Sequence, residues 1–471
     1  MTHHRKKICF FLNSISRGGA GRLISLLDGH LDKNHFELSF LTLVSDTSFI
    51  KSTGIQSPVY TLFSDDFTKA HDRAKKIDRF FQKNTPDLVV CFTAYHSPYL
   101  SIPAASNNIP VLFYCSTDLP RHIQRLTQFL PAEGTEVFLS SINEFLSSCS
   151  AVFTFGKNTS QSLKNAYGFE ADQTIENLRS DFKLTNSERN GVPGPKIISS
   201  GRLVYEKGFH DLIHASVDLP LLDITIIGNG PEKESLEKLI KETKSSVKLL
   251  PFISDEDTFK QFQTADLFVL PSHYEAFPGI ILDAMQAGLP IVATDVGELS
   301  NILKKGAPLA IPANPTSLSQ SIKTFFEQKD LFIRAPNEYS KILERCSPQS
   351  ILEKWSDILS TNWKHNNSTD SHSIKETLRE LMAQYLCSYK DGIDIYGTGQ
   401  LAGHVSEFLC ESGVLVKETF DRNASGGAKL IDQRKKDTLD PLIVCSIHFR
   451  SIIGTLKDEG HTGPIYRFPE C

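Results

Sequence analysis

The residues best placed to do chemistry stand together in the second half of the chain, around a short turn. Glu275 and Asp283 are eight positions apart, and Pro278 lies between them after an apolar run that ends at Leu270. Because proline is favoured in the first helical turn, the pattern predicts a strand, a turn carrying Glu275, and a helix that starts near Pro278. Turns at the carboxyl ends of parallel strands bind ligands, and free helix N–H groups can hold phosphate. The carboxylates accept hydrogen bonds, so they suit a ligand rich in hydroxyls, such as a sugar.

Two cations stand in a second turn, upstream of the first. Arg202 follows the predicted strand Lys196–Ser200, and Lys207 comes five positions later, before another predicted helix. A guanidinium can fork onto phosphate oxygens, and an ammonium acts as a point charge. We expect both cations at the mouth of the crevice that holds the carboxylates. Taken alone, each is typical of a solvated surface residue.

Two glycine turns also follow predicted strands. Gly18 and Gly19 come after the first strand, and Gly228 comes after Leu222–Ile227. Glycine lets the backbone approach a ligand closely. A strand, a glycine turn and a helix recur in many α/β proteins, so each motif is weak by itself. The ordered set of four, spread over two similar halves, is much harder to obtain by chance.

The elements that must position these residues alternate along the chain. Strands that alternate with helices predict parallel sheets covered by helices on both faces. The strands are expected at Ile8–Leu12, Glu37–Leu43, Leu88–Phe92, Val111–Tyr114 and Ala151–Phe155, and then at Lys196–Ser200, Leu222–Ile227, Val247–Leu250, Leu267–Leu270 and Ile291–Ala293. The predicted fold class is therefore α/β, with two Rossmann-like doubly wound domains that face a cleft.

Polar stretches at 170–195 and 361–373 interrupt the alternation. They predict an N-terminal Rossmann-like domain at 1–180, a C-terminal Rossmann-like domain with its following helices at 181–365, and a small third α/β unit at 366–471.

The third unit carries a motif of its own. The predicted strand Ile393–Tyr396 is followed by Gly397 and Gly399, and Asp421 comes at the spacing of a degenerate dinucleotide-binding fingerprint. A nucleotide-fold scaffold used for packing or partner binding is an equally good interpretation.

Composition and charge exclude several classes of protein. The net charge of −5 gives no reason to expect nucleic acid as a partner. No apolar run approaches the roughly 18 residues of a membrane span. The nine cysteines form no metal-binding spacing and several lie in apolar strands, so we expect reduced thiols and no structural metal. The sequence thus predicts a cytoplasmic protein, and it leaves open peripheral attachment to the inner face of a membrane.

With these motifs in order, the chain resembles the retaining GT-B glycosyltransferases of family 4, over about residues 7–360 and most strongly at 196–305. The resemblance implies a nucleotide-diphosphate sugar as donor, with a UDP-sugar favoured, and no cofactor. Arg202 and Lys207 would contact the donor diphosphate, Glu275 the donor sugar, and Asp283 the ribose. Further donor contacts would come from Gly18, Gly19, Gly228, Phe252, Ala276, Phe277, Pro278, Gly279 and Ile280. The third unit resembles small Rossmann-like modules appended to bacterial sugar-modifying enzymes.

The chain departs from the family pattern at two places. Asp283 stands where the family has a second Glu, and one methylene less shortens its reach. Thr117 stands where many members carry a His near the acceptor, so Thr117, Asp118 and His122 are the candidate acceptor-side residues. His96 is a further substitute for that His, and a structural role is the simpler interpretation of either His.

The resemblance implies metal-independent hexosyl transfer to a saccharide or lipid-linked acceptor in the assembly of a bacterial-type surface polysaccharide or glycoconjugate. Cations and helix N–H groups would stabilise the departing diphosphate. The acidic runs Asp65–Asp66 and Asp255–Asp257 are more simply explained as solvated turns than as metal ligands. A GT-B sugar-nucleotide epimerase and a non-catalytic nucleotide-sugar-binding scaffold remain as alternatives.

Overall fold

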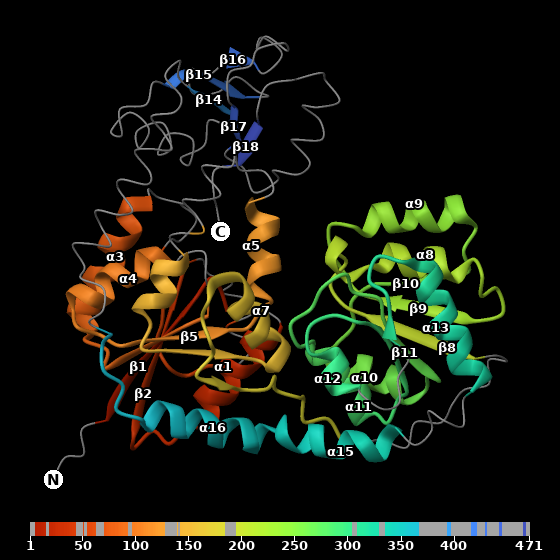
Figure 1. The fold of residues 1–471 in the computed structure, drawn as a ribbon, viewed down its shortest axis with the longest axis horizontal. Helices are drawn as coiled ribbons and strands as arrows, with labels where there is room; N and C mark the ends of the chain where they lie inside the picture. The colour runs from red at the N-terminus through yellow and green to blue at the C-terminus, as the bar shows by residue number, and fades with distance from the viewer. Residues whose placement is uncertain are drawn as a thin grey trace.

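The computed structural model describes residues 5–15, 18–43, 50, 54–62, 70–92, 97–127, 139, 142–183, 195–303, 309–328 and 335–366. Beyond these it describes five strands, at 393–396, 416–421, 429–430, 442–444 and 465–467. These residues build three parallel β-sheets in succession along the chain (Figure 1).

The first sheet has seven strands in the order β3-β2-β1-β4-β5-β6-β7. Its elements are β1 (Lys6–Leu12), α1 (Gly19–His30), β2 (Phe36–Thr42), β3 (Val59–Thr61), α3 (Ala70–Asn84), β4 (Leu88–Cys91), α4 (Ser97–Ser106), β5 (Val111–Cys115), α5 (Leu119–Thr127), β6 (Ala151–Thr154), α7 (Lys157–Tyr167) and β7 (Gln173–Thr174).

The central strands of this sheet are largely apolar, as expected where both faces are covered. In β1, Ile8 and Phe10 belong to one hydrophobic cluster while Cys9 and Phe11 belong to another. Successive side chains of a strand point to opposite faces, so the two clusters are the two layers between the sheet and its helices. Cys9 is fully buried as part of that packing.

The second sheet has six strands in the order β10-β9-β8-β11-β12-β13. Its elements are β8 (Lys196–Ser200), α8 (Phe209–Ser216), β9 (Asp223–Ile227), α9 (Lys233–Thr243), β10 (Lys248–Leu250), α10 (Asp255–Gln263), β11 (Leu267–Leu270), α11 (Gly279–Gln286), β12 (Ile291–Thr294), α12 (Leu299–Ile302), β13 (Leu309–Ala310) and α13 (Pro315–Glu327). All predicted strands of the two domains form, with ends shifted by a residue or two.

In both sheets the chain order reverses beside the first strand. In the second sheet β8 lies between β9 and β11, and Leu267 pairs with Ile197, so Ser200 and Leu270 end level with each other. In a doubly wound sheet this switch point opens a crevice at the carboxyl ends of the strands. The turns that carry Arg202 and Glu275 therefore emerge side by side.

Two helices, α15 (Ala335–Arg345) and α16 (Pro348–Ser360), run along one side of both domains (Figure 1). The sequence assigns α16 to the second domain, but the structure places it against the first. Trp355 of α16 is fully buried there, stacked on Phe92 at 6.2 Å between ring centroids and edge-on to Tyr114 at 5.2 Å. Likewise β7 pairs with β6, so the first sheet extends into the stretch that was predicted to be a linker.

The third sheet has the order β16-β15-β14-β17-β18, built from β14 (Ile393–Tyr396), β15 (Val416–Asp421), β16 (Lys429–Leu430), β17 (Leu442–Val444) and β18 (Ile465–Arg467). All its pairs are parallel, with the Rossmann type of order in which the first strand is central. Asp421 ends β15, the neighbour of β14, while Gly397 and Gly399 lie outside the described residues. Among the described helices, none is long and apolar enough to cross a membrane.

Candidate active site

The structure joins the two main motifs of the second domain through one ion pair. Lys207 Nζ lies 2.5 Å from Glu275 Oε1, and Ser272 Oγ donates to the same carboxylate oxygen at 2.9 Å. The Glu275 side chain is 11% exposed, so this carboxylate is largely withdrawn from solvent. Within the described residues, Oε2 of Glu275 has no partner, and an ammonium has three donors of which Lys207 uses one here. Both groups therefore keep capacity for a ligand.

The turn of Lys207 is fixed by its contact with the Glu275 loop. Gly208 has a φ of +62°, and a Cβ there would collide with the carbonyl of Pro271. His273 donates its N–H to Glu206 O at 2.8 Å, and its ring nitrogen Nε2 lies 2.8 Å from Asp211 Oδ2. The two turns therefore form one unit, and the position of the cation is set by the loop that carries the carboxylate.

Arg202 lies on the same rim and is exposed. Among the described residues its guanidinium has no ion-pair partner. Its turn rests on the glycine turn after β9, because a Cβ at Gly228 would collide with the carbonyl of Gly201 and Leu203 N donates to Asn229 O at 2.9 Å. Gly228 is a predicted donor contact, and in the structure it also supports the turn of Arg202.

Asp283 is engaged by the first domain. Its Oδ2 lies 3.2 Å from Nη1 of Arg22 in α1, and its Oδ1 accepts a hydrogen bond from Ser180 N at 3.3 Å. Arg22 also reaches Ser180 Oγ at 2.9 Å and Asp255 Oδ2 at 3.2 Å. The Asp283 side chain is only 4% exposed, and this burial raises its pKa above the ordinary value while Arg22 opposes the rise. Asp283, which stands where the family has the longer Glu, thus forms an ion pair with Arg22 of the other domain.

The first turn of α11 meets the glycine turn of the first domain through Asn177. Asn177 Nδ2 donates to Phe277 O at 2.7 Å, and a Cβ on Gly19 would lie 3.4 Å from Asn177 Oδ1. A Cβ on Gly279, the first residue of α11, would lie 3.5 Å from Asn177 Nδ2. Gly18 precedes α1 with a φ of +144°, which favours glycine. The two backbone segments predicted to face phosphate, at Gly19 and Gly279, therefore lie close together beside Asn177.

The other residues of the Glu275 loop serve packing as well. Ala276 and Phe277 are buried, and Phe277 packs edge-on against Phe155 of the first domain, with ring centroids 6.0 Å apart. Pro278 immediately precedes α11 and Ile280 is half-buried. Their side chains anchor the loop, while the N–H groups at the start of the helix remain candidates for phosphate binding.

Phe252, one of the predicted donor contacts, carries an exposed aromatic side chain. Phe252 follows β10 and is 38% exposed, which is unusual for an aromatic residue beside a sheet end. Its backbone N–H donates to Asn229 Oδ1 at 3.4 Å, so it lies beside the glycine turn. A flat exposed ring at this place can stack on a base.

The acceptor-side candidates cluster at the start of α5. Thr117 is exposed, whereas Asp118 is 9% exposed and accepts a hydrogen bond from Ser162 Oγ at 2.9 Å. His122 N donates to Asp118 O at 2.9 Å in the first turn of the helix. Asp118 therefore holds α5 to α7, and Thr117 is the most accessible of the three. His96 lies outside the described residues.

The acidic run Asp255–Asp257 forms the first turn of α10. Ser254 caps this helix by accepting the N–H of Asp257 at 3.0 Å, and Lys260 pairs with Asp257 at 3.1 Å. Carboxylates are stabilised at a helix N-terminus, which explains the run without a metal. In the part of the chain that the structure describes, no group of three or more His, Cys, Asp or Glu side chains could hold a metal ion. Asp65 and Asp66 lie outside the described residues.

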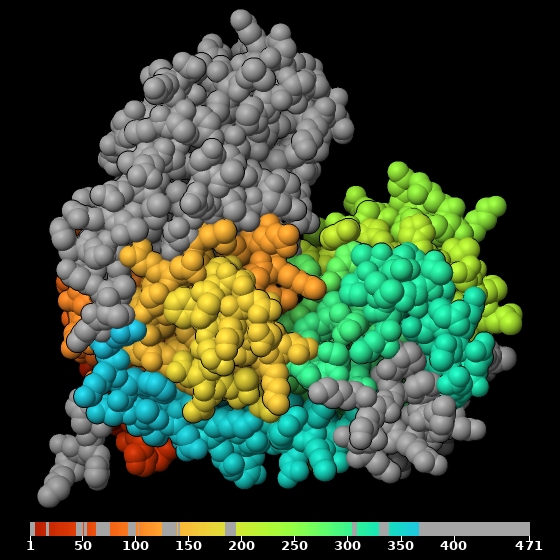
Figure 2. Space-filling view, in the orientation of Figure 1, coloured from red at the N-terminus to blue at the C-terminus, as the bar shows by residue number. Residues whose placement is uncertain are grey.

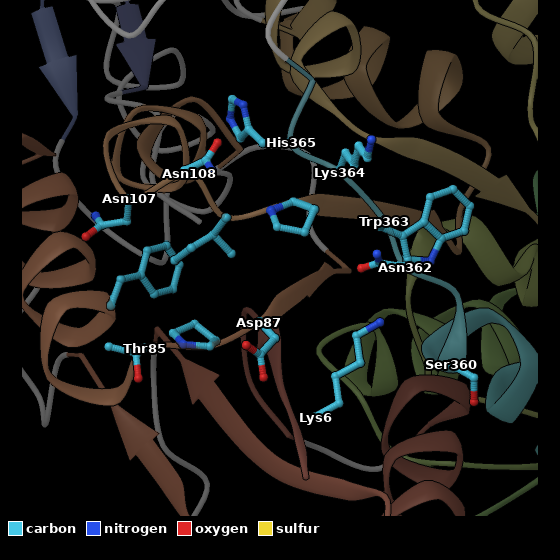
Figure 3. Close-up of a pocket in the computed structure, with 14 residues that line it drawn as sticks. Lys6, Thr85, Asp87, Asn107, Asn108, Ser360, Asn362, Trp363, Lys364 and His365 are labelled. Carbon is cyan, nitrogen blue, oxygen red and sulfur yellow. The ribbon is translucent and has the colours of Figure 1, made fainter. Parts of the chain in front are cut away.

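A pocket of about 870 Å³ lies at the opposite edge of the first sheet, at the amino ends of its strands (Figure 3). Lys6, Asp87 and the segment after α16 line it. Lys6 Nζ donates to Thr361 O at 2.5 Å, Asp87 Oδ2 accepts from Lys7 N at 2.8 Å, and Asn107 Nδ2 donates to Asp78 Oδ1 at 2.7 Å. These polar groups make hydrogen bonds within the protein. The crevice at the carboxyl ends of the strands therefore remains the candidate site, and the pocket does not.

Four residues that connect the two domains are not among those predicted from the sequence: Arg22, Asn177, Ser180 and Glu298. Arg22 stands three positions after Gly19 of the glycine turn, so its position was visible in the sequence. Nothing local marks the other three, because their partners lie about 100 residues or more away. The two domains meet along a seam in Figure 2, where the orange and yellow surface of the first touches the green surface of the second.

Two Rossmann-like domains that face each other through the carboxyl ends of their strands define the GT-B fold. Solved structures agree: Anabaena HepE in complex with UDP and glucose superposes with a TM-score of 0.63 at 21% identity, covering 76% of this chain and all of that one.

Residues 182–342 match the family of Glycosyl transferases group 1. An uncharacterized glycosyltransferase of Haemophilus influenzae is 21% identical over 370 residues, which are 75% of this chain and the whole relative. The Bacillus subtilis protein TuaC, a putative teichuronic acid biosynthesis glycosyltransferase, is 29% identical over 165 residues, or 34% of this chain and 39% of the relative. Other curated relatives, at 31–35% identity, are matched over 40% of their length or less. Together the comparisons support a glycosyltransferase of the GT-B fold.

Proposed function

We propose that the chain transfers a hexose from a nucleotide-diphosphate sugar, with a UDP-sugar favoured, to a saccharide or lipid-linked acceptor, with retention of configuration and without a metal. The observation that carries the proposal is the Lys207–Glu275 contact. It brings a cation and a carboxylate, 68 residues apart in the sequence, to one place at the carboxyl ends of β8 and β11. A donor with a diphosphate next to a polyhydroxylated ring needs this pair of groups.

In this proposal the cations act on the leaving group. Breaking the sugar–phosphate bond leaves additional negative charge on the diphosphate, and Arg202 and Lys207 stand where that charge develops. The free N–H groups at the start of α11 add a fixed partial positive charge. Such preorganised charges stabilise the transition state more than the ground state, and this difference raises the rate.

The carboxylates and the aromatic ring bind the rest of the donor. Glu275 Oε2 accepts hydrogen bonds from the donor sugar hydroxyls, Asp283 serves the ribose, and Phe252 stacks on the base. The Gly18–Gly19 turn closes on the diphosphate from the first domain. Thr117, Asp118 and His122 remain the proposed acceptor side, and retention would follow from attack on the face that the diphosphate leaves.

The proposed setting is surface polysaccharide or glycoconjugate assembly, at the inner face of a membrane. The support for this setting is the partial relative TuaC, whose name gives teichuronic acid biosynthesis. The support for UDP is the fold neighbour HepE, solved with UDP and glucose.

A panel of UDP-, GDP- and ADP-sugars, followed by thermal unfolding, tests the donor. A ligand at about 100 times its dissociation constant adds about 2.7 kcal/mol of stability, which is measurable as a shift in Tm. The stabilising donor is then incubated with an acceptor extract, and the anomeric configuration of the product is determined by NMR. No shift with any donor, or a product of inverted configuration, contradicts the proposal.

The same assay separates the alternatives. An epimerase would convert the donor without an acceptor, and a binding scaffold would be stabilised by the donor without turnover.

A further inference from the structure

Helix α7 of the first domain begins without a side chain of its own to cap it. Gly156 precedes the helix, and its N–H donates to Thr159 Oγ1 at 2.9 Å. This is one half of a capping box; in the other half, the side chain at the cap position accepts the N–H of the residue three places on. Glycine has no side chain, so Thr159 N needs an acceptor from elsewhere.

The missing acceptor comes from the second domain. Glu298 Oε1 accepts Thr159 N at 2.7 Å and Thr159 Oγ1 at 3.0 Å, and the residue is only 3% exposed. A Cβ at Gly156 would lie 2.5 Å from the carboxyl carbon of Glu298, so glycine is what lets the carboxylate approach. Next to it, Asn158 Nδ2 donates to Gly297 O at 2.7 Å. A carboxylate at a helix N-terminus is favoured by the helix dipole, so this contact is a specific bond between the two domains.

Glu298 is also bonded to the loop that carries Glu275. Its N–H donates to Ala276 O at 2.8 Å. Gly297 has a φ of +55°, and a Cβ there would collide with the carbonyls of Glu275 and Ala276. Contacts therefore run without a gap from α7 through Glu298 to the loop of Glu275, and the position of the first domain bears directly on the loop of the candidate site.

We propose that Glu298 is a positioning residue, a helix cap delivered from the second domain into the first, which holds the two domains closed and keeps the Glu275 loop in place for the donor. When the domains separate, α7 loses its cap and Glu298 loses the two donors of Thr159, keeping the Asn301 Nδ2 bond within its own domain at 3.0 Å, so the closed arrangement is favoured. The effect on the donor rests on the proposed function, in which the diphosphate bridges the two domains. The effect on domain closure does not rest on the proposed function.

Two variants break the contact between Glu298 and the start of α7, which we call the latch, in different ways. Glu298→Ala removes the carboxylate. Gly156→Ser gives α7 its own capping hydroxyl, and its Cβ displaces the flexible Glu298 side chain; the φ of −179° at Gly156 is extended backbone that serine adopts. Because α7 stays capped in Gly156→Ser, this variant separates loss of the latch from loss of helix stability. Glu242→Ala on α9, where the side chain is 59% exposed in a helical pair, is the matched control.

The full chain is examined by small-angle X-ray scattering without nucleotide, and by calorimetry with whichever of UDP, GDP or ADP the wild type binds best. Both latch variants should show a larger radius of gyration and about 5- to 150-fold weaker nucleotide binding, the usual range of coupling between sites. The double variant should be no worse than either single one, and Glu242→Ala should match the wild type.

Folded variants, as judged by circular dichroism, that keep the wild-type radius of gyration and dissociation constant overturn the latch. A wild type that binds none of the three nucleotides overturns the proposed function instead, and the scattering comparison still decides whether Glu298 holds the domains closed.

Discussion

Arg22 of α1 and Asp283 of α11 form an ion pair across the seam between the domains, with Nη1 3.2 Å from Oδ2. Asp283 is the carboxylate assigned to the ribose, and it is almost fully buried. Burial favours its neutral form and raises its pKa, and Arg22 counteracts this by stabilising the charged form. The ionisation of Asp283, in the second domain, therefore depends on a residue of the first.

The first prediction concerns the pH dependence of stability in Arg22→Gln. A carboxyl whose pKa in the folded state is raised above its ordinary 3.8 binds more protons in the folded than in the unfolded state at pH values between the two pKa values. Stability therefore falls as the pH rises through this range. Losing Arg22 raises the folded-state pKa further and extends this pH range upward. The variant should lose up to about 3 kcal/mol at neutral pH and less at about pH 5. Urea unfolding at both pH values measures this loss, with Arg22→Gln/Asp283→Asn as the control without the pH difference. An equal loss at both pH values means that Asp283 is not the group responsible.

The second prediction concerns nucleotide binding by Asp283 variants. A hydrogen bond to a charged group contributes about 1.5–3 kcal/mol, so Asp283→Ala should weaken binding of the nucleotide diphosphate by about 10- to 100-fold. Asp283→Glu restores the carboxylate of the family pattern and should recover most of the affinity. Calorimetry measures both. Wild-type affinity in Asp283→Ala would leave the carboxylate with only its role in the domain interface.

The third prediction concerns turnover in Lys207→Ala and Arg202→Ala. Losing one preorganised electrostatic contact typically costs about 100- to 1000-fold in rate, so each should lower kcat by that factor. Lys207→Arg should recover part of it, because a planar fork does not replace a compact ammonium beside Glu275. The double variant should be less than multiplicatively worse, since both cations act on one diphosphate.

Turnover is measured at saturating donor, with circular dichroism as the folding control. Lys238→Ala, on α9 with a side chain 76% exposed, should be unaffected. If both active-site variants stay folded and keep wild-type kcat, neither cation holds the leaving group.

The fourth prediction concerns the attachment of α16 to the first domain. Trp355 is fully buried among aromatic rings, so Trp355→Ala should lower the free energy of unfolding by about 3–5 kcal/mol. Its Nε1 is buried without a partner among the described atoms, so Trp355→Phe gives up no hydrogen bond and should cost much less. Chemical denaturation measures both. An alanine variant as stable as the phenylalanine variant would mean that α16 is not held by this side chain.

The fifth prediction concerns metal. Because cations and helix N–H groups are proposed to balance the diphosphate, turnover should survive EDTA. Loss of activity on chelation, restored by Mg²⁺ or Mn²⁺, contradicts it.

Most strands of the first two sheets could be predicted from the sequence, with ends within one or two residues of those observed. Four of the predicted strands, Ile8–Leu12, Leu88–Phe92, Val111–Tyr114 and Leu267–Leu270, contain at least four consecutive buried apolar residues, as expected where both faces of a parallel sheet are covered. Most of the others mix buried apolar residues with polar or exposed ones, as Val247–Leu250 does. The strands that were not predicted are short. The two residues of β7, Gln173 and Thr174, are both exposed, so no apolar pattern marks them and only pairing with β6 makes them a strand. Since Arg202 and Glu275 follow strand ends, their shared crevice was also predictable.

The contacts between side chains of the two domains could not be predicted from the sequence. Arg22 and Asp283 are 261 positions apart, and Thr159 and Glu298 are 139 apart. No local pattern encodes such contacts, because they depend on how two separately folded sheets pack and on which polar groups that packing buries. Gly156 illustrates this reason. In the sequence it is an ordinary glycine before a helix, and in the folded protein its lack of a Cβ lets the Glu298 carboxylate of the other domain cap that helix.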